Sequence, residues 1–253
     1  MISSIGGWTN QELVQYLRTG HVEGKAQAGG GMAEAVQNSF QHMSDADLQA
    51  IASYLKTVKP VRNAQQQTPA YSVDKAKTAD WESSEFPIDN NATPSRHDNL
   101  SNLSGVSLYN SACAACHGMQ GEGTPDQVIP SLSRNSAVGA ELANNVVMAI
   151  SQGIYRETQG TMASMPAFSA QAEHITSTLS PAQIASVTNY VMAQYGKDDP
   201  GLTEQDVLQI QQGGGSSFLI CYAALLAWIG FGAGAIFLLV ALIFMVKFCR
   251  KKR

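Results

Sequence analysis

The chain has 253 residues, with 20 acidic and 16 basic side chains and a formal net charge of −4 at pH 7. That length allows one large or two small domains, and the low charge fits a soluble part joined to an apolar one. The charge is uneven: up to Val246 there are 11 basic and 20 acidic residues, whereas five of the last seven residues are basic. An acidic soluble part lacks the clustered positive charge that binds nucleic acid, which excludes that partner.

The first sixty residues predict two capped helices. The opening residues contain neither a basic n-region nor an apolar h-region, so the sequence predicts no secretory signal at this start. A capping box at Thr9 and Glu12 opens a helix that ends at Gly20. A glycine-rich loop at 29–32 follows, and a second capping box at Ser44 opens the next helix.

Two stretches of the chain share one pattern. In each, a glycine that ends a helix precedes a methionine by twelve positions: Gly20 and Met32 in the first, Gly153 and Met165 in the second. A serine-capped helix follows each methionine. The sequence therefore predicts an internal repeat.

The first copy of the repeat is expected to be incomplete. In the second copy His117 precedes Met165 by 48 positions, which would put the matching histidine about 16 residues before Met1. We therefore expect residues 1–59 to be an N-terminally truncated domain and residues 104–196 the complete one. The alternative is a small helical element in which a methionine merely fills a loop.

The sequence Cys113-Ala114-Ala115-Cys116-His117 has the spacing of a covalent haem attachment site. Two thiols at i and i+3 can form thioethers with the vinyl groups of one porphyrin, and the next histidine can bind the iron. A thioredoxin-type pair would need a preceding strand, and a zinc site would need four ligands. We therefore expect one haem c, held by Cys113, Cys116 and His117.

The iron needs a second axial ligand, and a methionine thioether suits electron transfer because it favours the reduced iron. Met165 is preferred to Met162, because Pro166 stiffens the loop that must hold the sulfur. The other methionines of this domain lie too close to His117 or at helical spacing, where packing is the simpler role: Met119, Met148 and Met192.

The ring N–H of the histidine also needs an acceptor, usually a backbone carbonyl. The proline-braced chain at Pro130 is the predicted source, and the alternative is that Pro130 simply ends a loop. Gly118, Gly121 and Gly123 are expected to let the backbone pass close to a porphyrin.

At these residues the sequence resembles a known family. The motif CAACHG, the Ile129-Pro130-Ser131-Leu132 run and Ser164-Met165-Pro166-Ala167-Phe168 are similar to those of a class I cytochrome c domain. The resemblance implies an all-α fold in which Cys113, Cys116, His117 and Met165 hold a haem.

The N-terminal stretch resembles the multihaem cytochrome c subunits of membrane-bound alcohol, gluconate and related dehydrogenases, through Gly7-Trp8-Thr9, Tyr16-Leu17-Arg18-Thr19-Gly20 and the helix around Tyr54. Such subunits carry three haem domains in series. The resemblance implies that this chain holds the end of the second domain and the whole third. Met32 would then be the axial ligand of a second haem, whose attachment motif is missing here.

The segment 218–246 contains 29 residues without a charge, about 43 Å as a helix, and predicts a transmembrane span. The basic residues 247–253 place the C-terminus in the cytoplasm and the haem domain in the bacterial periplasm. Residues 60–103, rich in Asn, Ser and Gln, are predicted to be a linker, and residues 197–217 a tether.

The expected architecture is thus a cytochrome c-like helical domain, a partial second one and a C-terminal transmembrane helix in the inner membrane. The expected role is electron transfer from a periplasmic flavin or quinoprotein dehydrogenase to quinone or a terminal oxidase, with no reaction on the substrate itself. The alternatives are a peroxidase-like haem enzyme or sensor with an open sixth position, and a structural anchor subunit.

Overall fold

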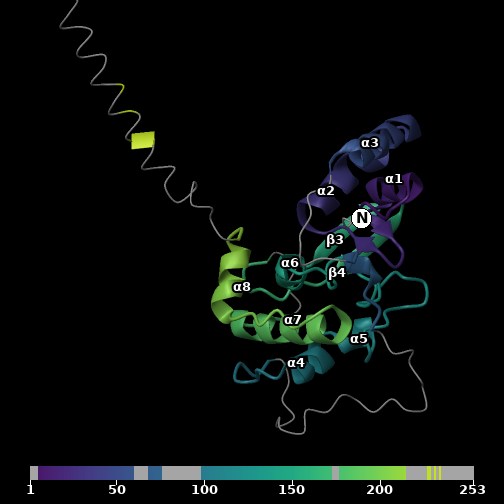
Figure 1. Ribbon diagram of the computed structural model, residues 1–253. Coiled ribbons are helices and arrows are strands. Elements are labelled where there is room, and N and C mark those ends of the chain that lie inside the picture. Colours follow the sequence, from purple (N-terminus) through teal and green to yellow (C-terminus); the bar gives the residue numbers. More distant parts are fainter. Residues whose placement is uncertain are drawn as a thin grey trace, which may run out of the picture. The chain divides into compact units, whose positions relative to one another are not determined.

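The computed structural model describes residues 5–59, 68–75, 98–172 and 177–214, together with Ala227, Trp228, Phe231 and Gly234. Contacts divide the chain into two compact units, Met1–Gln212 and Gly213–Arg253. Over its described residues the larger unit is mainly helical, with two antiparallel β-hairpins (Figure 1). The helical class predicted from the sequence is confirmed. The hairpins were not predicted, because their strands are only two to five residues long.

The N-terminal region contains α1 (Asn10–Thr19), β1 (His21–Val22), β2 (Ala26–Gln27), α2 (Gly30–Asn38), the 3-10 helix η1 (Phe40–His42) and α3 (Asp45–Thr57). Helix α1 begins at the predicted capping box, in which Thr9 and Glu12 each accept a hydrogen bond from the backbone N–H of the other. It ends at Gly20, whose left-handed φ of 72° is a conformation that favours glycine.

The second region contains the 3-10 helix η2 (Ala70–Ser72), α4 (Gly105–Ala112), α5 (Ala114–His117), α6 (Asn144–Gln152), β3 (Ile154–Thr158), β4 (Thr161–Met165), α7 (Pro181–Tyr195) and α8 (Glu204–Gln211). Strands β3 and β4 pair with Ile154 opposite Met165. Helix α7 begins at a capping box formed by Ser180 and Gln183.

The two regions share an order of elements. In each, a helix ends at a glycine with a φ of 72°, Gly20 or Gly153, and the chain turns into an antiparallel hairpin. A helix capped by a serine side chain follows, with Ser44 before α3 and Ser180 before α7. This shared order is what an internal repeat requires.

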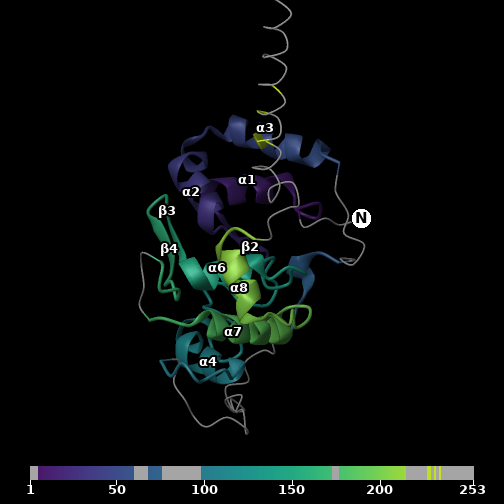
Figure 2. The same ribbon diagram turned by 90° about the vertical axis from the view of Figure 1, so that its left-hand side faces the viewer.

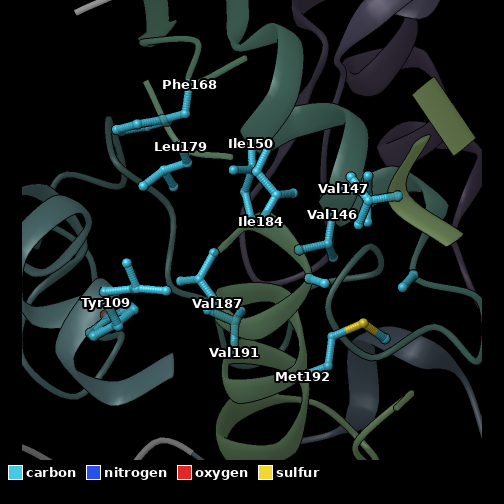
Figure 3. Close-up of a cluster of buried hydrophobic side chains, with 14 of the residues drawn as sticks. Tyr109, Val146, Val147, Ile150, Phe168, Leu179, Ile184, Val187, Val191 and Met192 are labelled. Carbon is cyan, nitrogen blue, oxygen red and sulfur yellow. The ribbon is translucent and has the colours of Figure 1, made fainter. Parts of the chain in front are cut away.

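The core of the second region lies where α4, α6 and α8 pack around α7. Figure 3 shows Tyr109 of α4 and Val187 and Val191 of α7 within this cluster. Helix α4 approaches α7 closely at Gly105, where a Cβ atom would lie 2.6 Å from both the Ser186 carbonyl oxygen and the Tyr190 Cβ atom. A glycine is therefore required at this crossing.

The N-terminal region packs against the β3–β4 hairpin, with α2 lying along β3. Both views place α1–α3 on one side of this hairpin and α4 and α7 on the other (Figures 1 and 2). Arg156 of β3 is 3% exposed, and its guanidinium donates to the Ala28 carbonyl oxygen at 2.7 Å and to Gln27 Oε1 at 3.1 Å. Gln41 adds a further hydrogen bond between the N-terminal region and β3, because its side-chain amide donates to the Glu157 carbonyl oxygen at 3.2 Å.

Two predicted connectors contain packed structure. Within the linker predicted at 60–103, Lys75 donates to the carbonyl oxygens of Ala193 and Lys197 at 3.2 and 2.8 Å. The segment 197–217, predicted to be a tether, contains a helix over residues 204–211. This helix is α8, whose Val207 is completely buried against α6 and α7. One short apolar face was too weak a pattern to reveal this helix.

The predicted transmembrane segment 218–246 lies outside the described residues, apart from Ala227, Trp228, Phe231 and Gly234, which are helical. In the parts of the chain that the structure describes, none of the helices combines the length and the apolar character that a bilayer crossing requires.

Replacing Gly105 by alanine should destabilise the α4–α7 crossing, because the new Cβ meets backbone and a helix-bound side chain at 2.6 Å. We expect a loss of about 1–3 kcal/mol in the free energy of unfolding, measured with urea. The matched control is Gly31→Ala on α2, where a Cβ would meet nothing within 4 Å. That variant should be as stable as the wild type or slightly more so. Equal destabilisation by both changes would contradict the assignment.

Candidate haem-attachment site

The motif Cys113–His117 forms a single helical turn. The backbone N–H groups of Cys116 and His117 both donate to the Cys113 carbonyl oxygen, at 3.1 and 3.0 Å. Two residues three apart are neighbours on a helical turn, so the two cysteines lie close together on this turn. Helix α5 ends at Gly118, which has a φ of 79°.

The two cysteines differ in their surroundings. Cys113 is half-buried, Cys116 is exposed, and both are free thiols. Burial raises the pKa of Cys113 to about 12, and the neighbouring Cys116 acts in the same direction. Cys113 is therefore held as a neutral thiol directed into the protein, whereas Cys116 stands at the surface.

His117 is suited to bind a metal as a neutral imidazole. Burial lowers the pKa of His117, and an interaction with the backbone of Pro130 opposes that shift. The only hydrogen-bonding group of a proline backbone is its carbonyl oxygen. The buried Nδ1 atom of His117 nevertheless makes no regular hydrogen bond. A buried imidazole left without a full set of partners fits the place of an iron ligand.

Backbone hydrogen bonds hold Pro130 beside the attachment turn. Thr124 N–H donates to the Ile129 carbonyl oxygen at 2.9 Å, and Leu132 N–H donates to the Gly121 carbonyl oxygen at 2.8 Å. Between them passes Gly123, with a φ of 70°, where a Cβ would lie 2.4 Å from the Ile129 carbonyl oxygen. The structure thus brings Pro130 to His117, as the predicted acceptor role requires.

The methionines of this domain lie in contrasting places. Met165, at the end of β4, is half-buried and packs against the core cluster that Cys113 also borders. Met162 is 54% exposed on the same strand. The remaining three occupy packing positions: Met119 borders the core, Met148 is half-buried on α6 and Met192 is 1% exposed. This arrangement agrees with preferring Met165 to Met162.

Met32 does not lie in the predicted loop at 29–32. It is half-buried in the first turn of α2, on the helix that packs against β3. Its proposed role as a ligand of a second haem remains a prediction.

The residues of the attachment turn fit a covalently bound haem. They offer two free thiols on one turn, a buried neutral histidine with an unpartnered Nδ1 atom, and glycines where a Cβ would clash. Within the described ranges, no group of three or more His, Cys, Asp and Glu side chains is arranged to hold a metal ion. The zinc alternative therefore has no ligand set in this part of the chain.

Residues 103–195 match the cytochrome c family, so the second region is a cytochrome c domain. A covalently bound haem c is the cofactor that this family implies.

Most of the chain is homologous to the cytochrome c subunits of several dehydrogenases. It is 34% identical over 212 residues to the fructose dehydrogenase cytochrome subunit of Gluconobacter japonicus, covering 84% of this chain and 42% of that protein. It is 29% identical over 217 residues to the alcohol dehydrogenase (quinone) cytochrome c subunit of Gluconacetobacter polyoxogenes, covering 84% and 41%. The gluconate 2-dehydrogenase cytochrome c subunit of Pantoea cypripedii is 28% identical over 221 residues, covering 83% and 44%. The chain thus spans less than half the length of these relatives.

Sequence reasoning missed three residues that shape the site and its surroundings: Tyr109, Arg156 and Tyr195. Arg156 is a charged residue on a strand that the sequence did not predict. The apolar spacing of the helices marks the tyrosine rings as core residues, but it carries no information about which carbonyl groups their hydroxyls reach.

The two thiols should react differently in haem-free protein. At pH 8, exposed Cys116 should be alkylated by iodoacetamide about ten times faster than Cys113 or more, because a pKa of about 12 leaves Cys113 almost no thiolate. Peptide mass spectrometry measures the two rates. In haem-loaded protein both sulfurs should be blocked, and labelling of either one there would contradict covalent attachment.

Proposed function

We propose that this chain is a membrane-anchored c-type cytochrome subunit that passes electrons from a dehydrogenase towards quinone or a terminal oxidase. The observation that carries the proposal is the Cys-x-x-Cys-His motif on one helical turn of a cytochrome c domain, with its histidine kept neutral by burial. The role we assign to the chain is that of an electron carrier, which the cytochrome c subunits among its relatives support.

A bound haem supplies a one-electron redox couple. In our proposal Cys113 and Cys116 would anchor it covalently, and His117 and the thioether of Met165 would be its iron ligands. The Pro130 carbonyl orients the imidazole. Met165 and Cys113 pack against the same core cluster, which supports placing them in one site.

The partner we propose is a dehydrogenase with a flavin or quinone cofactor. This assignment is supported by the relatives, which are named as cytochrome subunits of fructose, alcohol and gluconate dehydrogenases. The uncharged segment 218–246 and the basic residues after it support a single membrane span, with the cytochrome c domain in the periplasm.

We further propose that the N-terminal region is the closing part of a second cytochrome c-like domain. The shared order of helix, glycine, hairpin and serine-capped helix supports this assignment. A second haem with Met32 as its ligand would require an attachment motif supplied from elsewhere.

Replacing Met165 by alanine should lower the reduction potential, because a thioether favours ferrous iron and water in its place does not. The ferric protein should also change from a low-spin to a high-spin spectrum. The control is Met162→Ala, which removes an exposed methionine from the same strand and should leave both properties unchanged. If the wild type were high-spin and bound carbon monoxide without displacing a ligand, the enzyme or sensor alternative would replace this proposal.

Removing the residues after Gly214 should release the protein from membranes. The full chain should sediment with the membrane fraction, and the shortened chain should stay in the supernatant with an unchanged haem spectrum, because α8 and the core are retained. Fractionation followed by absorption spectroscopy makes the comparison. Sedimentation of both forms would contradict the proposed anchor.

A further inference from the structure

Three tyrosines gather behind the attachment turn. Tyr109 comes from α4, while Tyr190 and Tyr195 come from the last two turns of α7. The ring centroid of Tyr109 lies 5.4 Å from that of Tyr190 and 5.7 Å from that of Tyr195. The Tyr190 and Tyr195 rings meet edge to face at 6.4 Å. This tyrosine cluster joins the helix before the attachment motif to the closing helix of the domain.

Two hydroxyls of the tyrosine cluster hold the chain just after His117. Tyr109 Oη donates to the Gly118 carbonyl oxygen at 2.6 Å, and Tyr195 Oη donates to the Met119 carbonyl oxygen at 3.4 Å. The turn also passes directly over the Tyr195 ring, since a Cβ at Gly121 would lie 2.8 Å from it.

Tyr109 is bonded on both sides of the attachment motif. Its backbone carbonyl oxygen accepts from the Cys113 N–H at 2.8 Å, while its hydroxyl reaches Gly118. One rigid side chain therefore spans the stretch from the first cysteine to the residue after the histidine. Because Tyr109 is completely buried, its ring has no space in which to move, and the two ends of the motif keep one separation.

The hydroxyls remain donors throughout the physiological range. Burial raises the pKa of Tyr109, and burial together with the neighbouring Tyr109 raises the pKa of Tyr195. Neither phenol ionises near neutral pH, so both hydroxyls keep their protons there. The Tyr195 hydroxyl also interacts with the Tyr109 and Tyr190 hydroxyls. Its 3.4 Å contact with the Met119 carbonyl oxygen is therefore the weaker of the two bonds to the turn. Removing either hydroxyl would leave the Gly118 or the Met119 carbonyl oxygen with one hydrogen bond fewer.

We infer that Tyr109 and Tyr195 are positioning residues that fix the turn after His117 and thereby the orientation of its imidazole towards the iron. The inference rests on the proposed haem attachment. It assigns to the hydroxyls a role distinct from ring packing, namely to set how closely the turn covers the haem. That coverage limits how far water reaches the iron, and exposure of the iron to water is one determinant of the reduction potential.

The test compares Tyr109→Phe and Tyr195→Phe in the full, haem-loaded chain, since both changes keep the ring and remove only the hydroxyl. Loss of one such hydrogen bond should increase opening of the turn about fivefold. Amide hydrogen exchange over residues 117–121 should therefore accelerate by about that factor. The reduction potential should fall, because water admitted to the turn stabilises the more highly charged ferric state.

The matched control is Tyr54→Phe, the same chemical change at an exposed tyrosine of α3 that corresponds to Tyr190 in the repeat. It should alter neither the exchange rate nor the potential. If the Phe variants of Tyr109 and Tyr195 lose stability but keep the wild-type potential and local exchange rate, the tyrosines only pack and the inference is wrong.

Should Tyr109→Phe fail to accumulate, Tyr195→Phe decides alone, because it removes the bond to the Met119 carbonyl oxygen while the Tyr109 hydroxyl can still reach Gly118. A wild-type chain that carries no haem would contradict the proposed function itself. The wild-type spectrum shows this before any variant is compared, so the two failures are distinguishable.

Discussion

The close crossing of α4 over α7 is the contact on which the rest of the cytochrome c domain depends. It is possible only because Gly105 has no side chain, so that the two helices meet backbone to backbone at Ser186. The crossing brings Tyr109 beside Tyr190 and Tyr195, and it fixes the direction from which α4 delivers the attachment turn. The absence of a side chain at Gly105 thus determines where Cys113 and His117 lie relative to the core.

The two regions share an order of elements but bury the helix after the serine cap to different extents. Both regions contain a helix, a left-handed glycine, a hairpin and a serine-capped helix. In the second region α7 is covered by α4, and its Tyr190 is packed among other rings. In the N-terminal region the corresponding Tyr54 of α3 is 68% exposed. The same local pattern thus accompanies different burial of the corresponding tyrosine in the two regions.

The parts of the fold that were predictable from the sequence are those governed by local chemistry. Capping residues such as Thr9 and Ser180 and terminating glycines such as Gly20 act within one turn, so their pattern can be recognised without the fold. The attachment motif is equally local: Cys113 is the N-cap of α5, and Cys116 and His117 lie on that helix.

The parts that could not be predicted depend on contacts between distant segments. Arg156 reaches the Ala28 carbonyl group 128 residues away, and Tyr195 reaches the Met119 carbonyl group 76 residues away. Helix α8 has too few apolar positions for its periodicity to stand out, yet it buries Val207 completely. Hydroxyl and guanidinium partners of this kind are set by tertiary packing, which a single sequence does not encode in any local pattern.

Arg156 makes the joint between the N-terminal region and the β3–β4 hairpin stiff. Pulling the two apart would return a guanidinium to solvent and strip the Ala28 carbonyl group of its donor, while Gly20 leaves no slack around the same side chain. Two domains joined only by a flexible linker would sample many distances from one another. Held in this way the two regions keep one spacing, so that Met32 on α2 and Met165 at the end of β4 stay at a constant separation.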